Sequence, residues 1–231
     1  MLGTPTIEAH PALGRAELNI VAFLACSGGK ATEDQLIDAV WSGRLVERST
    51  LWNKMSRARS VLGRLLPPRE QSTGIVRLHP AVMTDLQLFS VFVSRAQVVS
   101  SYEAIGLLKD ALSLVRGVPF DAVGYEWAYE QQYHSSACEL IETAGLRLVE
   151  LALEADDIAT ARAGVSSALA ALKVNEPLYR ARMRVEAQAG NASGVQAAYN
   201  EIVALIGDLD GAPQSRVSPS TAKLFEALTS R

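Results

Sequence analysis

The stretch TEDQLIDAVWSGRLVERSTLWNKMSRARSVLG, residues 32–63, decides the fold of the first part of the chain. It begins with Thr32, whose hydroxyl can cap a helix, and Glu33 and Asp34 follow in the first turn, where the helix dipole favours acidic side chains. The pattern predicts a helix that ends near Gly43. Its predicted buried side consists of Leu36, Ile37, Val40 and Trp41.

A further helix is predicted from Arg48 or Ser49 to about Gly63, because apolar residues recur there at spacings of four, three and four. That buried stripe is Leu51, Met55, Ala58 and Leu62. At about 100° per residue, the opposite face carries Ser49, Asn53, Ser56, Arg57 and Ser60, with Lys54 and Arg59 beside it. Asn and Arg can bond base edges, so this face suits a major groove. An amphipathic helix whose polar face only contacts solvent has the same pattern.

The flanking residues extend the motif in both directions. Residues 14–26 predict a helix that ends at the Ser27-Gly28-Gly29 turn. After Pro67-Pro68, residues 74–78 predict a strand that pairs with residues 82–85. Three helices followed by a hairpin predict a winged helix-turn-helix over residues 1–85, with Arg77 on or beside the wing.

Positive charge is concentrated in this region. Residues 44–77 carry eight cationic side chains and two acidic ones, although the whole chain has a formal net charge of −3. Residues 1–85 have a net charge of +2 and residues 86–231 a net charge of −5. Phosphate neutralisation dominates affinity for nucleic acid, so the first region suits DNA and the second suits a protein partner.

Residues 86–231 predict an all-helical domain, because strand signals disappear and Ala, Leu and Glu become frequent. An internal offset of 34 residues aligns Asp157 with Asn191 and Val165 with Tyr199. This is the period of tetratricopeptide repeats, whose helix pairs stack on their neighbours. The predicted helices are 86–99, 102–115, 125–155, 158–172, 176–189, 192–207 and 218–229. The chain is therefore expected to be mainly α.

Several function classes find no support in the sequence. Cys26 and Cys138 lie far apart and in no metal-binding motif, which is typical of a cytoplasmic protein without a structural zinc site. No run approaches the roughly 18 apolar residues of a membrane helix. Nucleophile, metal and phosphate-loop motifs are missing. We therefore expect no enzymatic activity, no cofactor and no metal.

The order of these segments resembles the actinobacterial antibiotic-regulatory-protein type of transcription activators. These proteins join an OmpR-like winged helix to a bacterial transcriptional activator domain built on tetratricopeptide-like repeats. The segments that carry the resemblance are Phe23-Leu24-Ala25, Gln35 to Trp41, Thr50-Leu51, Met55 to Arg59, Leu62-Gly63, Val76 to Leu78, Thr84 to Phe89, Ala111-Leu112 and Arg116 to Phe120.

The resemblance implies that the third helix enters the major groove of direct-repeat promoter sites. By motif match, Asn53, Ser56 and Arg57 would face bases or phosphates. The cations Arg48, Lys54, Arg59 and Arg77 complete the predicted DNA-binding set, toward the backbone. The helical domain would mediate self-association and contact RNA polymerase or another protein.

Two departures from the family keep a second function open. Only Leu2 to Ala9 precede the first helix, which leaves room for one strand, or two, where the family has a small sheet; such domain pairs also stand at the C terminus of longer proteins. Trp52 is bulky for a groove-facing helix, and the basic charge is modest. The alternative is a protein-interaction module whose winged helix no longer binds DNA.

Overall fold

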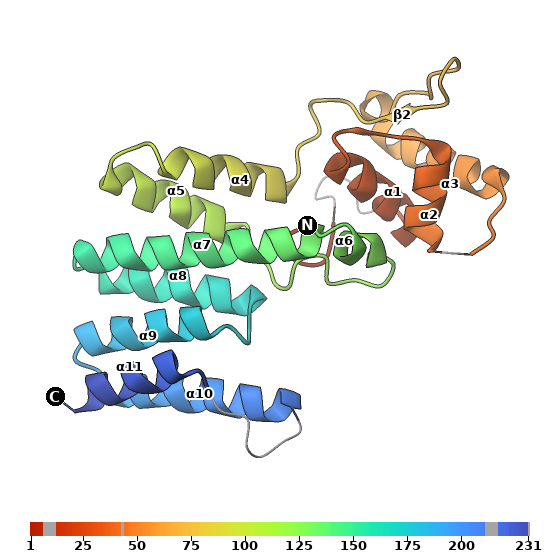
Figure 1. The fold of residues 1–231 in the computed structure, drawn as a ribbon. Helices are drawn as coiled ribbons and strands as arrows, with labels where there is room; N and C mark the ends of the chain where they lie inside the picture. The colour runs from red at the N-terminus through yellow and green to blue at the C-terminus, as the bar shows by residue number, and fades with distance from the viewer. Residues whose placement is uncertain (7–12, 43, 211–216, 231) are drawn as a thin grey trace. The chain divides into compact units, whose positions relative to one another are not determined.

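A computed structural model describes residues 1–6, 13–42, 44–210 and 217–230, and it is mainly helical (Figure 1). The chain divides into two compact units, which are treated separately below. Unit 1 comprises Met1–Leu88 and Gly117–Ala137, and unit 2 comprises Phe89–Arg116 and Cys138–Arg231. The described residues 2–6 form no strand, and the rest of the predicted strand region, residues 7–9, lies outside the described residues.

Three helices form the centre of unit 1: α1 (Arg15–Cys26), α2 (Glu33–Trp41) and α3 (Arg48–Leu62), followed by the short 3-10 helix η1 (Gly63–Leu65). The predicted cap of α2 is confirmed, because Thr32 Oγ1 accepts from the Gln35 amide at 3.3 Å and Gln35 Oε1 accepts from the Thr32 amide at 2.9 Å. The predicted stripe of α3 is confirmed as well. Its buried residues are Leu51, Met55, Ala58 and Leu62.

The wing strand has a different partner from the one predicted. Strand β2 (Val76–Arg77) pairs antiparallel with β1 (Lys30–Ala31), so the predicted hairpin with residues 82–85 is wrong. Thr84 explains the difference, because its hydroxyl accepts from the Gln87 amide at 3.0 Å while Gln87 Oε1 accepts from the Thr84 amide at 2.9 Å. This capping box commits the segment to a helix rather than to a strand.

Residues 117–137 pack in unit 1, where they contain the short helix α6 (Glu126–Glu130). Trp127 is 1% exposed, and its indole nitrogen donates to Asn19 Oδ1 at 2.7 Å. Its ring lies edge-on to Phe23, with 5.1 Å between centroids. The compact units divide after Leu88, and residues 117–137 pack with unit 1. The domain boundary at residue 86 stays a prediction.

The helix predicted over residues 125–155 is wrong at one point. It consists of α6 and α7 (Tyr133–Glu154), separated at Gln131 and Gln132. Gln132 has a φ of 63°, which is left-handed and interrupts a right-handed helix.

Unit 2 is a stack of successive helices (Figure 1). They are α4 (Asp85–Ala96) and α7, each beginning in unit 1, α5 (Ser101–Ser113), α8 (Ile158–Ala171), α9 (Glu176–Gln188), α10 (Ala192–Asp210) and α11 (Pro219–Thr229). Short capped turns separate α7 to α10. Asp157 Oδ1 accepts from the Thr160 amide at 3.0 Å, and Asn191 Oδ1 accepts from the Gly194 amide at 3.1 Å. The two residues aligned at an offset of 34 thus perform the same capping task.

The core of the last helices explains why they stack. Tyr179 and Met183 of α9 are buried against α10, together with Val195, Ala198, Ile202 and Val217. One helix pair could not bury these side chains alone. The predicted fold class, a mainly α chain with a tetratricopeptide-like helical part, is confirmed.

Candidate nucleic-acid interface

The outer face of α3 carries the residues predicted to read DNA bases. Asn53, Ser56 and Arg57 are exposed, as are Ser49 and Ser60 on the same face. Within the described part of the chain, the side chains of Asn53, Ser56 and Arg57 make no hydrogen bond or ion pair. This face therefore presents donors and acceptors that no other protein group occupies, which leaves them available for bidentate contacts with base edges.

Lys54 is held by the protein itself. Its Nζ lies 3.3 Å from Oε1 of Glu17, a residue of α1 that is only 4% exposed. A buried carboxylate needs a charged partner, so Lys54 ties α3 to α1. Its predicted contact with a phosphate would compete with this pair.

Arg59 also turns inward. Its Nε donates to the Leu66 carbonyl at 3.1 Å, and Nη2 is buried with no hydrogen-bond partner among the described residues. The side chain thus connects α3 to the segment that follows η1. A guanidinium in this position orients the end of the helix and leaves less of itself for a phosphate.

Arg48 and Arg69 meet the first turn of α2. Arg48 Nη2 lies 2.9 Å from Asp34 Oδ1, and Nη1 lies 3.8 Å from Glu33 Oε2. Glu33 is 7% exposed and also pairs with Arg69. The Arg69 guanidinium lies 4.6 Å from the centroid of the Trp52 ring. From the sequence, Trp52 is too bulky for a helix face that enters a groove. In the structure its half-buried ring packs against the Arg69 guanidinium in a cation–π contact.

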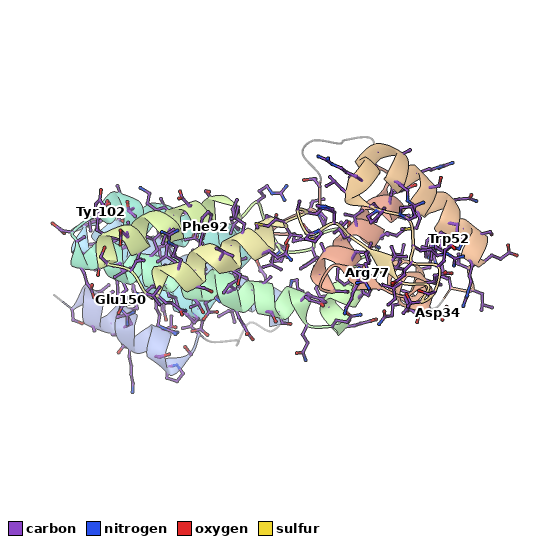
Figure 2. The ribbon with its side chains drawn as sticks, turned by 90° about the horizontal axis from the view of Figure 1, so that it is seen from above. Asp34, Trp52, Arg77, Phe92, Tyr102 and Glu150 are labelled. Carbon is purple, nitrogen blue, oxygen red and sulfur yellow. The ribbon has the colours of Figure 1, made fainter. Side chains whose placement is uncertain are left out.

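The roles of Glu33 and Arg69 are not predictable from the local sequence. Glu33 was interpreted as a favourable first-turn residue, and no local pattern relates it to a residue 36 positions away. Figure 2 labels Asp34 of α2, Trp52 of α3 and Arg77 of β2, all in unit 1.

Arg77 lies on strand β2, which pairs with β1. Its Nη2 is 3.4 Å from Oε2 of Glu70, and both side chains are about half exposed. The hydrogen bond from Thr73 is the main cause that lowers the pKa of Glu70, and Arg77 adds to it. Because exposed ion pairs contribute little, this pair can open to a phosphate at small cost.

The seven predicted residues thus fall into two groups. Asn53, Ser56 and Arg57 form a free face on α3, whereas Arg48, Lys54, Arg59 and Arg77 have partners within the protein. The described residues contain no cluster of three or more metal-binding side chains and no helix suited to crossing a membrane.

Comparisons with known proteins add the following findings. The family model described as bacterial transcriptional activator domain matches residues 84–224. Among solved structures, Mycobacterium tuberculosis EmbR, in complex with a low affinity phosphopeptide, is similar over 100% of this chain, with a TM-score of 0.65 and 18% identity. The chain spans 60% of the EmbR chain. No curated protein matched.

Proposed function

The chain belongs to the bacterial transcriptional activator domain family, and from this premise we propose that it is a DNA-binding transcription regulator of the activator type. The observation that carries the proposal is the free polar face of α3. A helix that is buried on one side and offers Asn53, Ser56 and Arg57 on the other has the chemistry to read a major groove.

The contacts within the protein suggest different tasks for the remaining cations. Arg77 pairs with an exposed carboxylate, and the shorter contact of Arg48 is also with an exposed one, so each can exchange that partner for a phosphate. The buried Glu33, which lies 3.8 Å from Arg48, would keep Arg69 as its partner. Lys54 and Arg59 instead hold α3 against α1 and against the Leu66 segment. We propose that these two act mainly by fixing the orientation of α3, and that Arg64, exposed just beyond its end, adds a phosphate contact.

Unit 2 is proposed to bind protein rather than DNA. The residues of unit 2 carry 12 basic and 14 acidic side chains, a net charge of −2, which does not attract phosphates. Self-association on direct-repeat sites would place two copies head to tail, because a two-fold axis would orient the half-sites oppositely. Contact with RNA polymerase is the other protein contact proposed for this unit.

A second function, a protein-interaction module without DNA binding, is favoured by one observation. Four of the seven predicted DNA-binding residues already have partners within the protein. In this function the free face of α3 would contact another protein.

The salt dependence of DNA binding separates the two functions. Fluorescence anisotropy with the full chain and duplex DNA would be measured between about 50 mM and 200 mM salt, where each phosphate contact contributes about −0.9 to the slope of log affinity against log salt. A regulator that contacts phosphates with Arg48, Arg64 and Arg77 should give a slope of about −2.7 or steeper. Undetectable DNA binding even at the lowest salt would contradict the regulator function and support the protein-interaction module.

A further inference from the structure

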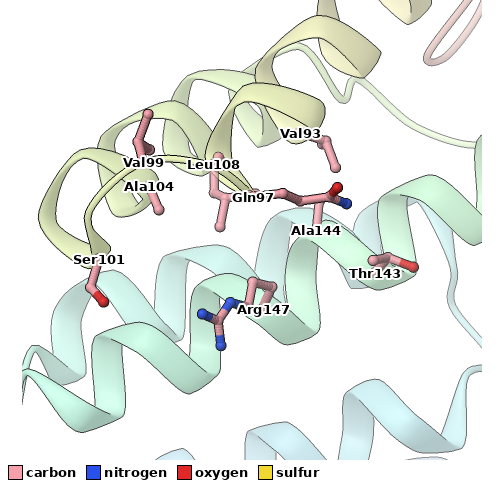
Figure 3. Close-up of a pocket in the computed structure, with 10 residues that line it drawn as sticks. Val93, Gln97, Val99, Ser101, Ala104, Leu108, Thr143, Ala144 and Arg147 are labelled. Atoms are coloured by element: carbon pink, nitrogen blue, oxygen red, sulfur yellow. The ribbon is translucent and has the colours of Figure 1, made fainter.

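A pocket of about 290 Å³ lies within unit 2, between the end of α4, the start of α5 and the middle of α7 (Figure 3). Its floor is apolar and closed to solvent. Val93, Ala104, Leu108 and Ala144 are each at most 4% exposed. The pocket therefore has an apolar floor that can receive an apolar group.

Small side chains create this space. Ala96, Ala104 and Ala144 face the pocket from α4, α5 and α7 respectively. Protein interiors are normally packed without voids, so three methyl groups in places where Leu or Met would fill the gap leave room for a guest. At this volume the pocket lies near the small end of the range for ligand sites, about 300–1,000 Å³.

The rim is polar and carries one sign of charge. Gln97, Thr143 and Arg147 border the opening, and among the lining residues Arg147 alone is charged. Arg147 pairs with Glu150 on the same helix, and the side chains are 51% and 58% exposed. Such exposed pairs contribute little, so the guanidinium can turn to a ligand at small cost. In Figure 3, the Gln97 amide and the Arg147 guanidinium come from different sides of the pocket.

We propose that this pocket binds a small amphipathic carboxylate, with its hydrocarbon part on the alanine floor and its carboxylate on Arg147. The guanidinium suits a carboxylate because it can donate two parallel hydrogen bonds. This site is independent of the proposed DNA contacts.

The test uses octanoate as the probe, with octanol and octylamine as neutral and cationic analogues of equal chain length. Isothermal titration of the full chain should show octanoate binding that Arg147→Gln weakens at least tenfold, while octanol binds both proteins equally weakly. Octylamine should not bind. Arg184→Gln, which removes an exposed cation of α9 outside the pocket, is the matched control and should leave octanoate affinity unchanged.

A second variant tests the place of binding. Ala96→Leu should fill the half-buried edge of the pocket and lower octanoate affinity at least tenfold, with helical circular dichroism unchanged. Absence of octanoate binding, equal binding of octylamine, or full affinity in either Arg147→Gln or folded Ala96→Leu would overturn the proposal. If Arg184→Gln and Arg147→Gln lowered octanoate affinity equally, the loss would come from the change in net charge and not from the pocket, and this result would also contradict the site.

Discussion

Glu186 shows how a single side chain links two helices of unit 2. This residue of α9 is 8% exposed, and it accepts hydrogen bonds from Arg162 of α8 at 2.8 and 2.7 Å and from Asn191 at 2.6 Å. The hydrogen bonds from Arg162 are the main cause that lowers the pKa of Glu186, against the opposing effect of burial. The carboxylate form therefore favours the folded state.

A pH dependence of stability follows from this lowered pKa. The contribution of Glu186 is fully present above the ordinary glutamate value of 4.5 and is lost as the pH falls through the lower folded-state value. Glu186→Gln should therefore be less stable than the wild type at neutral pH, and the difference should shrink below about pH 4. Urea unfolding followed by circular dichroism at several pH values measures it.

The control for this prediction is Glu150→Gln, which alters an exposed pair within one helix and should change stability little at any pH. A difference between wild type and Glu186→Gln that stays constant down to the lowest pH would contradict the assigned role.

At the residue scale, helical geometry predicts which face of a helix a side chain lies on better than it predicts which residue the side chain contacts. The angular position of Lys54 beside the exposed face of α3 was predictable, because it follows from 100° per residue. Its pairing with Glu17 was not, since the two residues are 37 positions apart and meet only when α1 packs on α3. The free state of Asn53, Ser56 and Arg57 agrees with the predicted outer face, but their DNA contacts stay a prediction.

At the scale of elements, the secondary structure differs from the prediction at a helix cap and at a helix break. The sequence pattern predicts a strand at Thr84, but Thr-x-x-Gln is also a capping box. The segment is helical because Thr84 and Gln87 exchange two hydrogen bonds. The break between α6 and α7 had no glycine or proline to mark it. Gln132 adopts a left-handed conformation there, which the sequence alone does not indicate.

Gln132 also offers a direct test of that break. Gln132→Gly should raise the free energy of unfolding by about 0.5–1 kcal/mol, because glycine adopts a φ of 63° without the steric cost that a Cβ imposes. Gln131→Gly is the matched control, and it should destabilise, since Gln131 has a φ of −92°. Urea denaturation would show it, and an unchanged or lowered stability in Gln132→Gly would argue against a strained turn.

At the scale of the whole molecule, the family domain and the compact units do not coincide. The match over residues 84–224 includes residues 117–137, which pack in unit 1 around Trp127. Sequence patterns place a domain boundary where composition changes, near residue 86. They do not reveal that a later segment returns to the first core, because Trp127 and Asn19 are 108 residues apart.

A fragment of residues 86–231 tests whether Trp127 packs in unit 1, because Trp127 is the single tryptophan of this fragment and its fluorescence reports on burial. The fragment should still lose helical circular dichroism cooperatively, since the core of unit 2 is intact. Its Trp127 emission should be red-shifted and readily quenched by iodide. In the full chain with Trp41→Phe and Trp52→Phe, Trp127 should be protected, and equal quenching in both proteins would contradict its burial in unit 1.

The central claim is that α3 reads DNA through its free outer face, and one comparison tests it most directly. Wild-type protein would select its preferred duplex from a random pool, and anisotropy would then compare affinities for that duplex and a scrambled one. Arg57→Ala should weaken binding to the selected duplex by about 1–3 kcal/mol and reduce discrimination, whereas the exposed control Arg184→Ala in unit 2 should change neither. Full affinity and full discrimination in Arg57→Ala would contradict the claim.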